Sequence, residues 1–401
     1  MRYRYSTGEN GRLIKRAVVY TRDEHGINFD DVDGEAVGIV KRLKDCGYET
    51  YIVGGAVRDL ILKKKPKDFD IVSEANPARI KKIFRNSRII GRRFKLVHVY
   101  FGPRIFEVST FRSLKDGLTS NTFGSINEDV LRRDFTMNAL FYDPGQQTVV
   151  DYIGGMKDIR ARRVRPIIPL ATIFRDDPVR MIRAVKYGAA AGFTLPLSLK
   201  WKIRSQSPLL ASVSPSRLTE EIFKIIHSPH AAKIVEALDG MGLYSYLQPK
   251  AAGLMKENHR FRSRYLRSMA ALSGESGHQD GGRRDGFKNL PGEALGALIN
   301  DYLEDITDWE RGITENYKAC FSAARNFVLP MNPPRFELGY AVRRFFAAHG
   351  VTVKKSHVID VSERGKGGKP PPRENAEGRA AEAPPRKRRK RRRKPAEKKG
   401  V

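Results

Sequence analysis

Residues Tyr51–Asp59 read YIVGGAVRD, and residues Lys65–Ile71, a few positions later, read KPKDFDI. The apolar residues before Gly54 and Gly55 predict a short buried strand, and the two glycines leave the following backbone amides open to a bound phosphate. Arg58 follows closely and adds a planar guanidinium that suits anions. These features predict a phosphate-binding turn between a strand and a helix.

An acidic pair, Asp68 and Asp70, lies close to this turn in the sequence. If residues 68–72 form a strand, its side-chain period of two places both carboxylates on one face and Phe69 on the other. Two adjacent carboxylates are suited to a divalent cation. A phosphate-binding turn next to a cation-binding acid pair predicts phosphoryl transfer.

The charge of the chain predicts a polyanionic partner. The chain has 401 residues, 40% of them hydrophobic, and a formal net charge of +30 at pH 7. This length allows two or three domains with sizeable cores. Proteins with such a cationic surplus accumulate on nucleic acids because they release counterions from phosphates. The alternative is a surplus that serves only solubility.

Cysteine usage and hydropathy indicate a cytoplasmic protein. The first 30 residues lack the apolar segment of a signal peptide, and no apolar run is long enough to span a membrane. Cys46 and Cys320 are the only two cysteines and lack the spacing of zinc ligands. We therefore expect a reducing compartment, no membrane contact and no zinc site.

Residue patterns predict a mixed α and β region that changes to a mostly helical one near residue 165. Strands are expected at 51–53, 68–72, 95–101 and 105–111, with helices from Asp33 and Asn76. Pro178 and Pro215 each follow a capping residue and begin a helix in the second half. Residues 1–29 have no clear periodicity and are interpreted as an extension on or near the first domain.

Three segments have the composition of loops or disordered chain. Residues 112–123 are expected to form a mobile loop, and the glycine-rich residues 273–286 a flexible excursion. Arg386–Lys394 is an unbroken run of nine basic residues, which predicts a tail that stays disordered until it meets a polyanion. A tail that only increases solubility is the alternative.

The two opening stretches and four later ones together resemble the nucleotidyltransferase superfamily, specifically the bacterial poly(A) polymerases and tRNA CCA-adding enzymes. The later stretches, in order, are IFEVSTFR at Ile105–Arg112, RRDFTMNAL at Arg132–Leu140, DYIGGMKD at Asp151–Asp158 and RDDPVRMIR at Arg175–Arg183. The resemblance covers residues 50 to 230 and is weak beyond them.

This resemblance implies an α+β fold, in which a nucleotidyltransferase head with a small mixed β-sheet and helices precedes an all-helical neck and body. The implied division is an N-terminal extension at 1–29, a catalytic head at 30–165, a neck that recognises the base at 166–230, an RNA-binding helical body at 231–361 and a disordered basic tail at 362–401.

Glu107 is the candidate for a third carboxylate. Phe106 and Val108 would point to the opposite face of a strand, so Glu107 could face Asp68 and Asp70. We expect these three acids to hold two Mg²⁺ ions, which would activate the attacking 3′-hydroxyl and neutralise the leaving pyrophosphate. Asp134 is the alternative third catalytic acid, although it is assigned more readily to positioning the nucleotide.

The resemblance also implies residues that bind ATP. Beyond the glycines and Arg58, two helices carry basic faces: one places Arg180, Arg183 and Tyr187 on a single stripe, and the other aligns Arg217, Glu221 and Lys224. The alternative for both faces is a solvated surface with salt bridges. The full set of expected nucleotide-binding residues is Gly54, Gly55, Arg58, Arg133, Asp177, Arg180, Arg183, Arg217, Glu221 and Lys224.

Two departures concern the choice of nucleotide. CCA-adding enzymes of this class have Glu-Asp-x-x-Arg where this chain has EEIFK, Glu220–Lys224. A longer carboxylate and an ammonium do not reproduce the bidentate pairing that Asp and Arg offer to cytosine. The sequence IIGRRFKLVHV at Ile89–Val99 is similar to a signature of the bacterial poly(A) polymerases. His98 within it is interpreted as structural.

The expected function is therefore template-independent addition of AMP from ATP to RNA 3′ ends. A tRNA CCA-adding enzyme is the first alternative, and a catalytically silent RNA-binding protein is the second. RNA 3′ ends of mRNA, decay fragments, tRNA or small RNAs are the expected partners, with RNA-decay proteins as further candidates. The oligomeric state and the RNA contacts of the body stay open, and the basic, aromatic segment Pro333–Arg344 fits either a packed helix, which we favour, or an RNA track.

Overall fold

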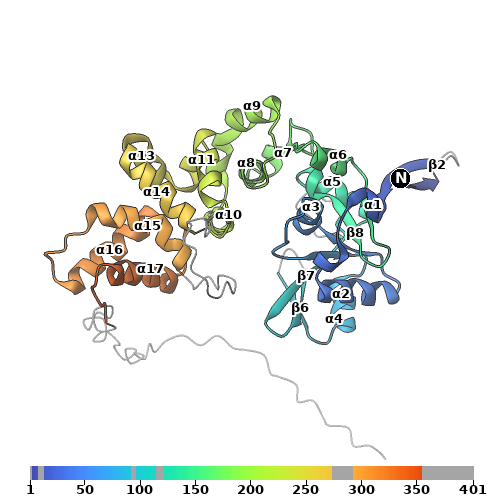
Figure 1. Ribbon diagram of the computed structural model, residues 1–401, viewed down its shortest axis with the longest axis horizontal. Helices are drawn as coiled ribbons and strands as arrows, with labels where there is room; N and C mark the ends of the chain where they lie inside the picture. Colours follow the sequence, from blue (N-terminus) through green and yellow to red (C-terminus); the bar gives the residue numbers. More distant parts are fainter. Residues whose placement is uncertain (1, 8–12, 92–95, 114–121, 273–291, 355–401) are drawn as a thin grey trace, which may run out of the picture. The chain divides into compact units, whose positions relative to one another are not determined.

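The computed structural model describes residues 2–7, 13–91, 96–113, 122–272 and 292–354 (Figure 1). The chain divides into a compact unit of residues 1–358 and a second unit of residues 359–401, and every described residue belongs to the first. The expected tail, the expected excursion at 273–286 and most of the expected loop at 112–123 lie outside the described residues. Residues 92–95 of the Ile89–Val99 signature do so as well.

The described residues contain a nine-stranded mixed sheet with the strand order β1-β2-β9-β8-β3-β4-β7-β6-β5. All neighbouring strands are antiparallel except β4 and β7, which are parallel. The strands are β1 Arg2–Thr7, β2 Leu13–Tyr20, β3 Thr50–Val53, β4 Asp70–Ser73, β5 Ser87–Ile90, β6 Leu96–Phe101, β7 Arg104–Thr110, β8 Leu140–Asp143 and β9 Thr148–Asp151.

The sheet is larger than the small one expected, because residues 1–29 contribute two strands to it. β1 and β2 form a hairpin, and Val18 to Tyr20 of β2 pair with β9. Arg and Tyr alternate from Arg2 to Tyr5, which is a strand pattern, but the stretch is short and the residues of β2 do not alternate. The division of the chain into five segments stays a prediction.

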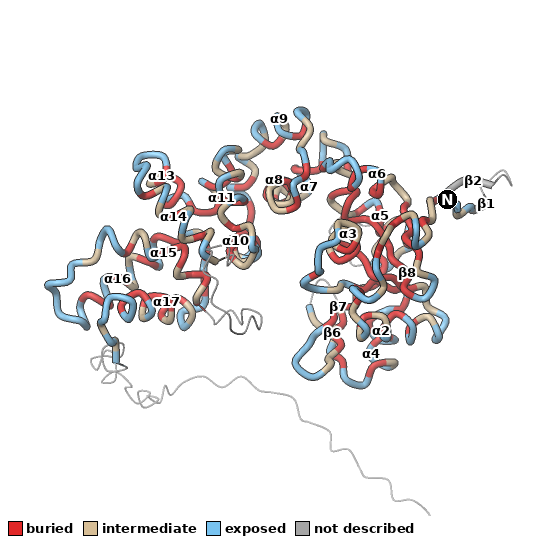
Figure 2. The backbone as a smooth tube through the Cα atoms, viewed as in Figure 1, coloured by how far each residue is buried: buried red, intermediate tan, exposed pale blue. Residues whose placement is uncertain are grey.

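The central strands are buried on both faces, which is why their sequences are apolar without alternation. Ile52 and Ile71 belong to the main hydrophobic cluster, whereas Tyr51, Val53 and Val72 belong to a smaller one on the opposite face. Helices α2 Gly34–Asp45 and α4 Pro77–Ile83 pack against strands of the sheet, and α5 Ile126–Arg132 contributes Ile126 and Val130 to the smaller cluster. Figure 2 shows the resulting buried strands in red.

Local capping explains where the predicted helices begin. Asp33 accepts hydrogen bonds from the amides of Glu35 and Ala36 at the start of α2, and Asn76 accepts one from Arg79 at the start of α4. The other short elements of the head are α1 Arg22–His25, η1 Phe29–Asp31, α3 Gly55–Ile61, η2 Thr136–Asn138 and α6 Gly155–Arg160.

From residue 173 onward the described chain is helical. Pro178 and Pro215 stand at the start of helices as expected. The elements are α7 Ile173–Asp176, α8 Val179–Ala191, α9 Leu197–Gln206, η3 Ser207–Ser212, α10 Pro215–Ile226, α11 Ala231–Gly240, α12 Tyr244–Leu247, α13 Pro249–Glu257, α14 His259–Ala271, α15 Glu293–Ile306, α16 Ile313–Phe327 and α17 Arg335–Ala348.

Helix α17 resolves the alternative left open for Pro333–Arg344. Leu338, Ala341 and Val342 are buried, and α17 packs against α15 and α16. The segment is a packed helix. No helix among the described ranges is long and apolar enough to cross a membrane.

Asp151 holds the turn between β9 and α6, within the segment DYIGGMKD. Its buried carboxylate accepts hydrogen bonds from the backbone amides of Ile153, Gly154, Gly155 and Met156, at 2.8 to 3.1 Å. A Cβ on Gly155 would lie 2.2 Å from the carbonyl oxygen of Thr136, so only glycine allows α6 to approach η2 this closely. The segment therefore fixes the position of η2, which belongs to the candidate site.

We predict that Asp151→Asn lowers the free energy of unfolding by about 3 kcal/mol, because an amide cannot accept from four amides and loses the charge that strengthens these bonds. Chemical denaturation followed by circular dichroism measures this. The exposed Asp45→Asn is the control, with an expected change within about 0.5 kcal/mol. A loss below about 1 kcal/mol for Asp151→Asn would show that the carboxylate does not hold the turn.

Candidate functional site

The glycine turn and the acidic strand meet at one place. Val53, the last residue of β3, pairs with Asp70, the first residue of β4. Gly54 follows with φ +74°, a conformation that residues with a Cβ rarely adopt, and a Cβ there would lie 3.6 Å from Oδ2 of Asp70. The backbone of the turn therefore lies against this carboxylate, as the sequence predicted.

Glu107 lies beside Asp70 on the neighbouring strand. The parallel register pairs Ile71 of β4 with Val108 of β7, so the preceding residues of the two strands are neighbours too. Ile71 and Val108 both face the main hydrophobic cluster. Because side chains alternate along a strand, Asp70 and Glu107 share the opposite face.

Asp68 reaches this place differently from the expectation. The strand begins at Asp70 and not at residue 68, so Asp68 lies in an irregular segment before it and is exposed. Pro66, which cannot continue a ladder of hydrogen bonds, is the signal in the sequence for this later start. Asp68 still acts electrostatically on Asp70, as described next.

The carboxyl group of Asp70 has a pKa raised to about 6. Desolvation is the largest cause, since protein surrounds the group although part of the side chain stays accessible. The negative charges of Glu107 and Asp68 also raise this pKa, while Arg133 and Lys224 lower it. A divalent cation would relieve the mutual repulsion among these acids, and carboxylate oxygens are the kind of donor that Mg²⁺ prefers.

Within the described parts of the chain, no group of three or more His, Cys, Asp or Glu side chains has an arrangement that could hold a metal ion. The acids form a cluster on one face rather than a closed coordination shell. His98 pairs with Glu107 across β6 and β7, and its Nε2 lies 3.5 Å from Oε1 of Glu107. The structural role of His98 stays a prediction.

Arg58 on α3 is fixed from three sides. Its guanidinium donates to Asp59 at 2.9 Å and to Oδ1 of Asn138 at 2.9 Å, and it lies 5.2 Å from the ring centre of Tyr187 on α8. A Cβ on Gly55 would lie 3.6 Å from one of its nitrogens. Arg58 is thus positioned beside the glycine turn, as an anion-binding residue would be.

Asn138 joins Arg58 to the segment RRDFTMNAL. Its amide nitrogen donates to Oδ1 of Asp134 at 3.1 Å, and its backbone carbonyl accepts from Arg133 at 3.1 Å. Arg133 also pairs with Asp129 at 2.9 Å. Sequence reasoning did not identify Asn138 or Asp129, although Asn138 stands inside a motif that had been noted.

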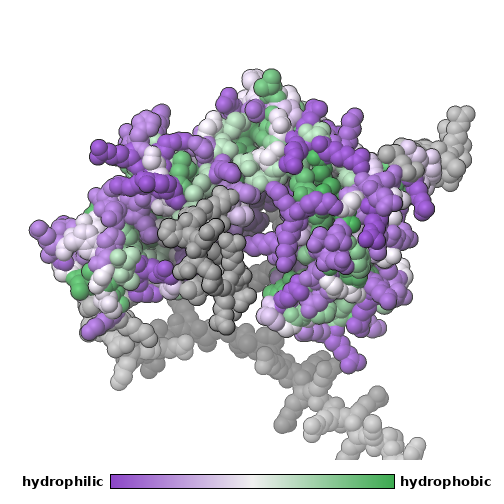
Figure 3. All heavy atoms as spheres, in the orientation of Figure 1, coloured by the Kyte–Doolittle hydropathy of each residue, from purple (hydrophilic) through white to green (hydrophobic). Residues whose placement is uncertain are grey.

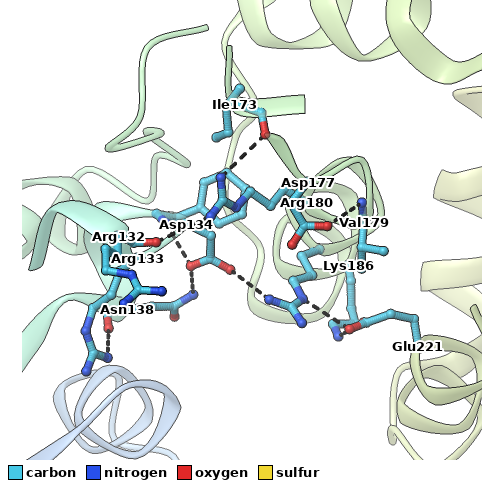
Figure 4. A network of polar contacts seen from close by, with 12 residues as sticks. Arg132, Arg133, Asp134, Asn138, Ile173, Asp177, Val179, Arg180, Lys186 and Glu221 are labelled. Carbon is cyan, nitrogen blue, oxygen red and sulfur yellow. Dashed lines mark hydrogen bonds and ion pairs between the residues drawn. The ribbon is translucent and has the colours of Figure 1, made fainter. Parts of the chain in front are cut away.

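A chain of polar contacts runs from Asp134 through Arg183 to Glu221 (Figure 4). Asp134 lies 4.0 Å from Arg183, whose Nε donates to Oε1 of Glu221 at 3.1 Å. Lys186 donates to Oε2 of Glu221 at 2.7 Å. These contacts connect the segment between α5 and η2 to α8 and α10, and so link the head to the two helices that carry basic faces.

Glu221 is buried, with 2% of its side chain exposed. Burial alone would raise the pKa of its carboxyl group, but Lys186, Arg183 and Lys224 lower this pKa to about 2. Burial lowers the pKa of Lys186, and the contact with Glu221 opposes that effect. Lys186 was missed by sequence reasoning, although it is three residues from Arg183 on the same helix.

The remaining expected residues are arranged in two ways. Arg217 donates to both carboxylate oxygens of Asp177 at 2.9 Å, which ties the start of α10 to the start of α8. Arg180 is buried and donates towards the backbone carbonyls of Ile173 and Arg132 at 3.4 to 3.5 Å. The expected stripe of Arg180 and Arg183 is therefore not one ligand-facing surface, because Arg180 contacts the backbone.

We predict that Asp70→Asn stabilises the protein by about 1 kcal/mol at pH 8 without divalent cations, after allowance for solvent screening. The folded pKa of Asp70 lies above its ordinary value of 3.8, so the charged form costs stability above about pH 6 and the cost disappears below about pH 4. Thermal unfolding across this range measures the difference. Added Mg²⁺ should stabilise the wild type but not the variant, and a variant that is no more stable at pH 8 would contradict the repulsion.

We predict that Glu221→Gln costs about 3 kcal/mol at pH 7, because Arg183 and Lys186 lose a buried counter-charge. The folded pKa of Glu221 is about 2, below its ordinary value of 4.5. Its contribution is therefore present above pH 4.5 and is lost as the pH falls towards 2, so wild type and variant should converge there. The exposed neighbour Glu220→Gln is the control, and an equal effect of both substitutions on urea unfolding would refute the argument.

Two family models match the chain. The model described as the Poly A polymerase head domain matches residues 50–165. The model described as the probable RNA and SrmB-binding site of polymerase A matches residues 192–255.

The similar proteins include both poly(A) polymerases and CCA-adding enzymes. Poly(A) polymerase I of Escherichia coli O6:H1 is 40% identical over 269 residues, which cover 63% of this chain and 58% of that protein. The CCA-adding enzyme of Geobacillus stearothermophilus is 39% identical over 229 residues, which cover 56% of each chain. The chain thus spans less than two thirds of the length of either relative.

Solved structures show the same fold. The crystal structure of the Bacillus stearothermophilus CCA-adding enzyme in complex with CTP is 28% identical, with a TM-score of 0.51 over 84% of this chain and 88% of that one. A tRNA nucleotidyltransferase complexed with a primer tRNA and an ATP analogue aligns with a TM-score of 0.52 at 23% identity, over 80% of this chain and 87% of that one. The expected fold class, a nucleotidyltransferase head followed by a helical region, is therefore confirmed. Over the matched residues, the chain is similar to the bacterial poly(A) polymerases and to the CCA-adding enzymes.

Proposed function

We propose that this protein is a polynucleotide adenylyltransferase that adds AMP from ATP to RNA 3′ ends without a template. The observation that carries the proposal is the position of Asp70 and Glu107 on one face of the sheet, directly beside the Gly54 turn. Acids next to a phosphate-binding turn suit the transfer of a nucleotidyl group. The relatives named poly(A) polymerase I support this reading.

The carboxylates of Asp68, Asp70 and Glu107 are the proposed ligands of two Mg²⁺ ions, with Asp134 as the alternative third acid. When bound, these ions would lower the pKa of the RNA 3′-hydroxyl and neutralise charge on the pyrophosphate that leaves. Asp134 accepts a hydrogen bond from Asn138 and lies 4.0 Å from Arg183, which suits a residue that positions the nucleotide.

The triphosphate is proposed to bind at the amides after Gly54 and Gly55 and at Arg58. Asn138, Asp59 and Tyr187 hold the Arg58 guanidinium, so little conformational entropy remains to be lost on binding. Arg133, Asp177, Arg183 and Arg217 are further candidates for contacts to ATP. Arg180 is proposed to support this surface through its backbone contacts rather than to touch ATP.

The choice of ATP over CTP rests on Glu221 and Lys224. Both carboxylate oxygens of Glu221 are occupied by Arg183 and Lys186, and Nζ of Lys224 lies 3.6 Å from Oε1. Glu221 therefore has little acceptor capacity left for the amino group that cytosine and adenine both carry, and discrimination is proposed to depend on Lys224. Lys224, with 55% of its side chain exposed, is proposed to be the donor nearest the adenine.

A tRNA CCA-adding enzyme is the second candidate, because the similarity to the Geobacillus enzyme is almost as high as that to the poly(A) polymerases. RNA 3′ ends are the proposed partners in either case, which the net charge of +30 supports. A cytoplasmic location and an association with RNA-decay proteins belong to the same proposal. The basic tail Arg386–Lys394 is proposed to add an RNA-binding arm.

Extension assays with each nucleotide separately test the proposal. We predict that the full chain with Mg²⁺ extends oligo(A) into long products with ATP and extends it poorly with CTP, GTP or UTP. Strong CTP incorporation on tRNA that lacks its terminal CCA, with a stop after three additions, would instead identify a CCA-adding enzyme.

The same assay distinguishes an enzyme from a silent RNA-binding protein. Asp70→Ala should reduce ATP incorporation by at least about 1,000-fold, since the loss of a metal ligand removes several kcal/mol of transition-state stabilisation. RNA affinity should be retained, and Asp45→Ala should behave as wild type. Retained incorporation in Asp70→Ala would contradict the assigned role of this acid.

A further inference from the structure

Helix α9 exposes a large apolar side on the surface of the protein. Leu199 and Ile203 are buried, and they anchor the helix. Leu197 and Trp201, one turn apart, face outward with 83% and 69% of their surface exposed. Trp201 is the more exposed of the two tryptophans in the chain. It contributes little to the packing of α9, which Leu199 and Ile203 provide.

The two exposed residues line an open recess together with Leu170, Ala171, Ser198 and Lys202. Figure 3 shows a hydrophobic group of atoms, in green, at the position that Figure 1 labels α9. Leu197 and Trp201 thus form a small apolar patch bordered by Ser198 and Lys202, and its surroundings indicate which partner it suits.

The surroundings of this patch are basic. Residues 178–219 contain seven Lys and Arg and no Asp or Glu. Three of these cations, Lys200, Lys202 and Arg204, are on α9, and Lys200 and Lys202 are the immediate neighbours of Trp201. An aromatic ring between two cations suits a partner that presents flat rings on a negatively charged backbone.

Single-stranded RNA has this chemistry. Every base offers a face for stacking on an indole, and the phosphates between bases pair with lysine and arginine. An apolar protein segment would bury Leu197 and Trp201 but would gain nothing from the cations. A basic protein segment would be repelled by the lysines and arginine of α9. Charge complementarity therefore favours RNA as the occupant.

We propose that Trp201 stacks on an unpaired base of RNA and that Lys200 and Lys202 contact the adjacent phosphates. This proposal rests on RNA as the substrate in the proposed function, and it names one residue of the helical region that binds it. Because stacking requires an exposed base face, this contact selects unpaired RNA over duplex RNA and tolerates any base.

Tryptophan fluorescence reports this contact directly. Trp201 and Trp309 are the only two tryptophans, so Trp309→Phe leaves Trp201 as the single reporter. Oligo(A) should quench its emission in a saturable manner, whereas an abasic oligonucleotide of equal length and charge should not. Equal quenching by both, or no quenching by oligo(A), would overturn the proposal.

Affinity measurements give an independent test. Trp201→Ala should weaken oligo(A) binding about 5- to 150-fold, the range that corresponds to the loss of one stacked base. Trp201→Phe should retain part of the affinity because it keeps an aromatic face. Trp309→Phe is the matched control and should bind as the wild type does, since Trp309 packs against Phe345 and Phe346. Thermal unfolding of each variant identifies any loss of folding.

The outcomes separate this inference from the proposed function. If the wild type extends oligo(A) with ATP but Trp201→Ala binds oligo(A) with unchanged affinity, this inference is wrong and the proposed function stands, whatever else occupies the patch. If the wild type does not extend RNA at all, the proposed function fails. Saturable quenching of Trp201 by oligo(A) in Trp309→Phe, together with a loss of affinity in Trp201→Ala that Trp309→Phe does not show, would support stacking.

Discussion

The parallel pairing of β4 with β7 brings together acids from two parts of the chain that are 37 residues apart, Asp70 and Glu107. Residues 71 and 108 face the core on the same side, so the two acids must share the other side. Desolvation, together with the repulsion from Glu107, raises the pKa of Asp70 to about 6. Neighbouring carboxylates that repel one another and have a raised pKa are typical of sites that bind a ligand.

The helical region depends on a second charged contact, the buried carboxylate of Glu221. Arg183 and Lys186, both on α8, donate to this carboxylate, which belongs to α10. Arg217 connects the same two helices through its contact with Asp177. Arg183 also lies 4.0 Å from Asp134. The residues proposed to recognise the base are therefore attached to the residues proposed to position the triphosphate, so a change at Glu221 should affect both.

Several site residues could be predicted because their signals are local. Gly54 and Asp70 are close in sequence, and alternation around Phe106 and Val108 indicated the direction of Glu107. Asn138 and Lys186 could not be predicted in this way. Their roles arise from contacts with Arg58 and Glu221, which are 80 and 35 residues away. A sequence without tertiary contacts does not show which polar side chain meets which.

The sequence by itself determined the glycine turn, the acidic strand and the starts of the capped helices, because each depends on residues within a few positions of one another. Only the tertiary structure decided that residues 2–7 and 13–20 extend the sheet, that the strand starts at Asp70, that Arg180 contacts the backbone and that Trp201 stays exposed. Strand partners and burial depend on elements distant in the chain, and local residue preferences carry no information about them.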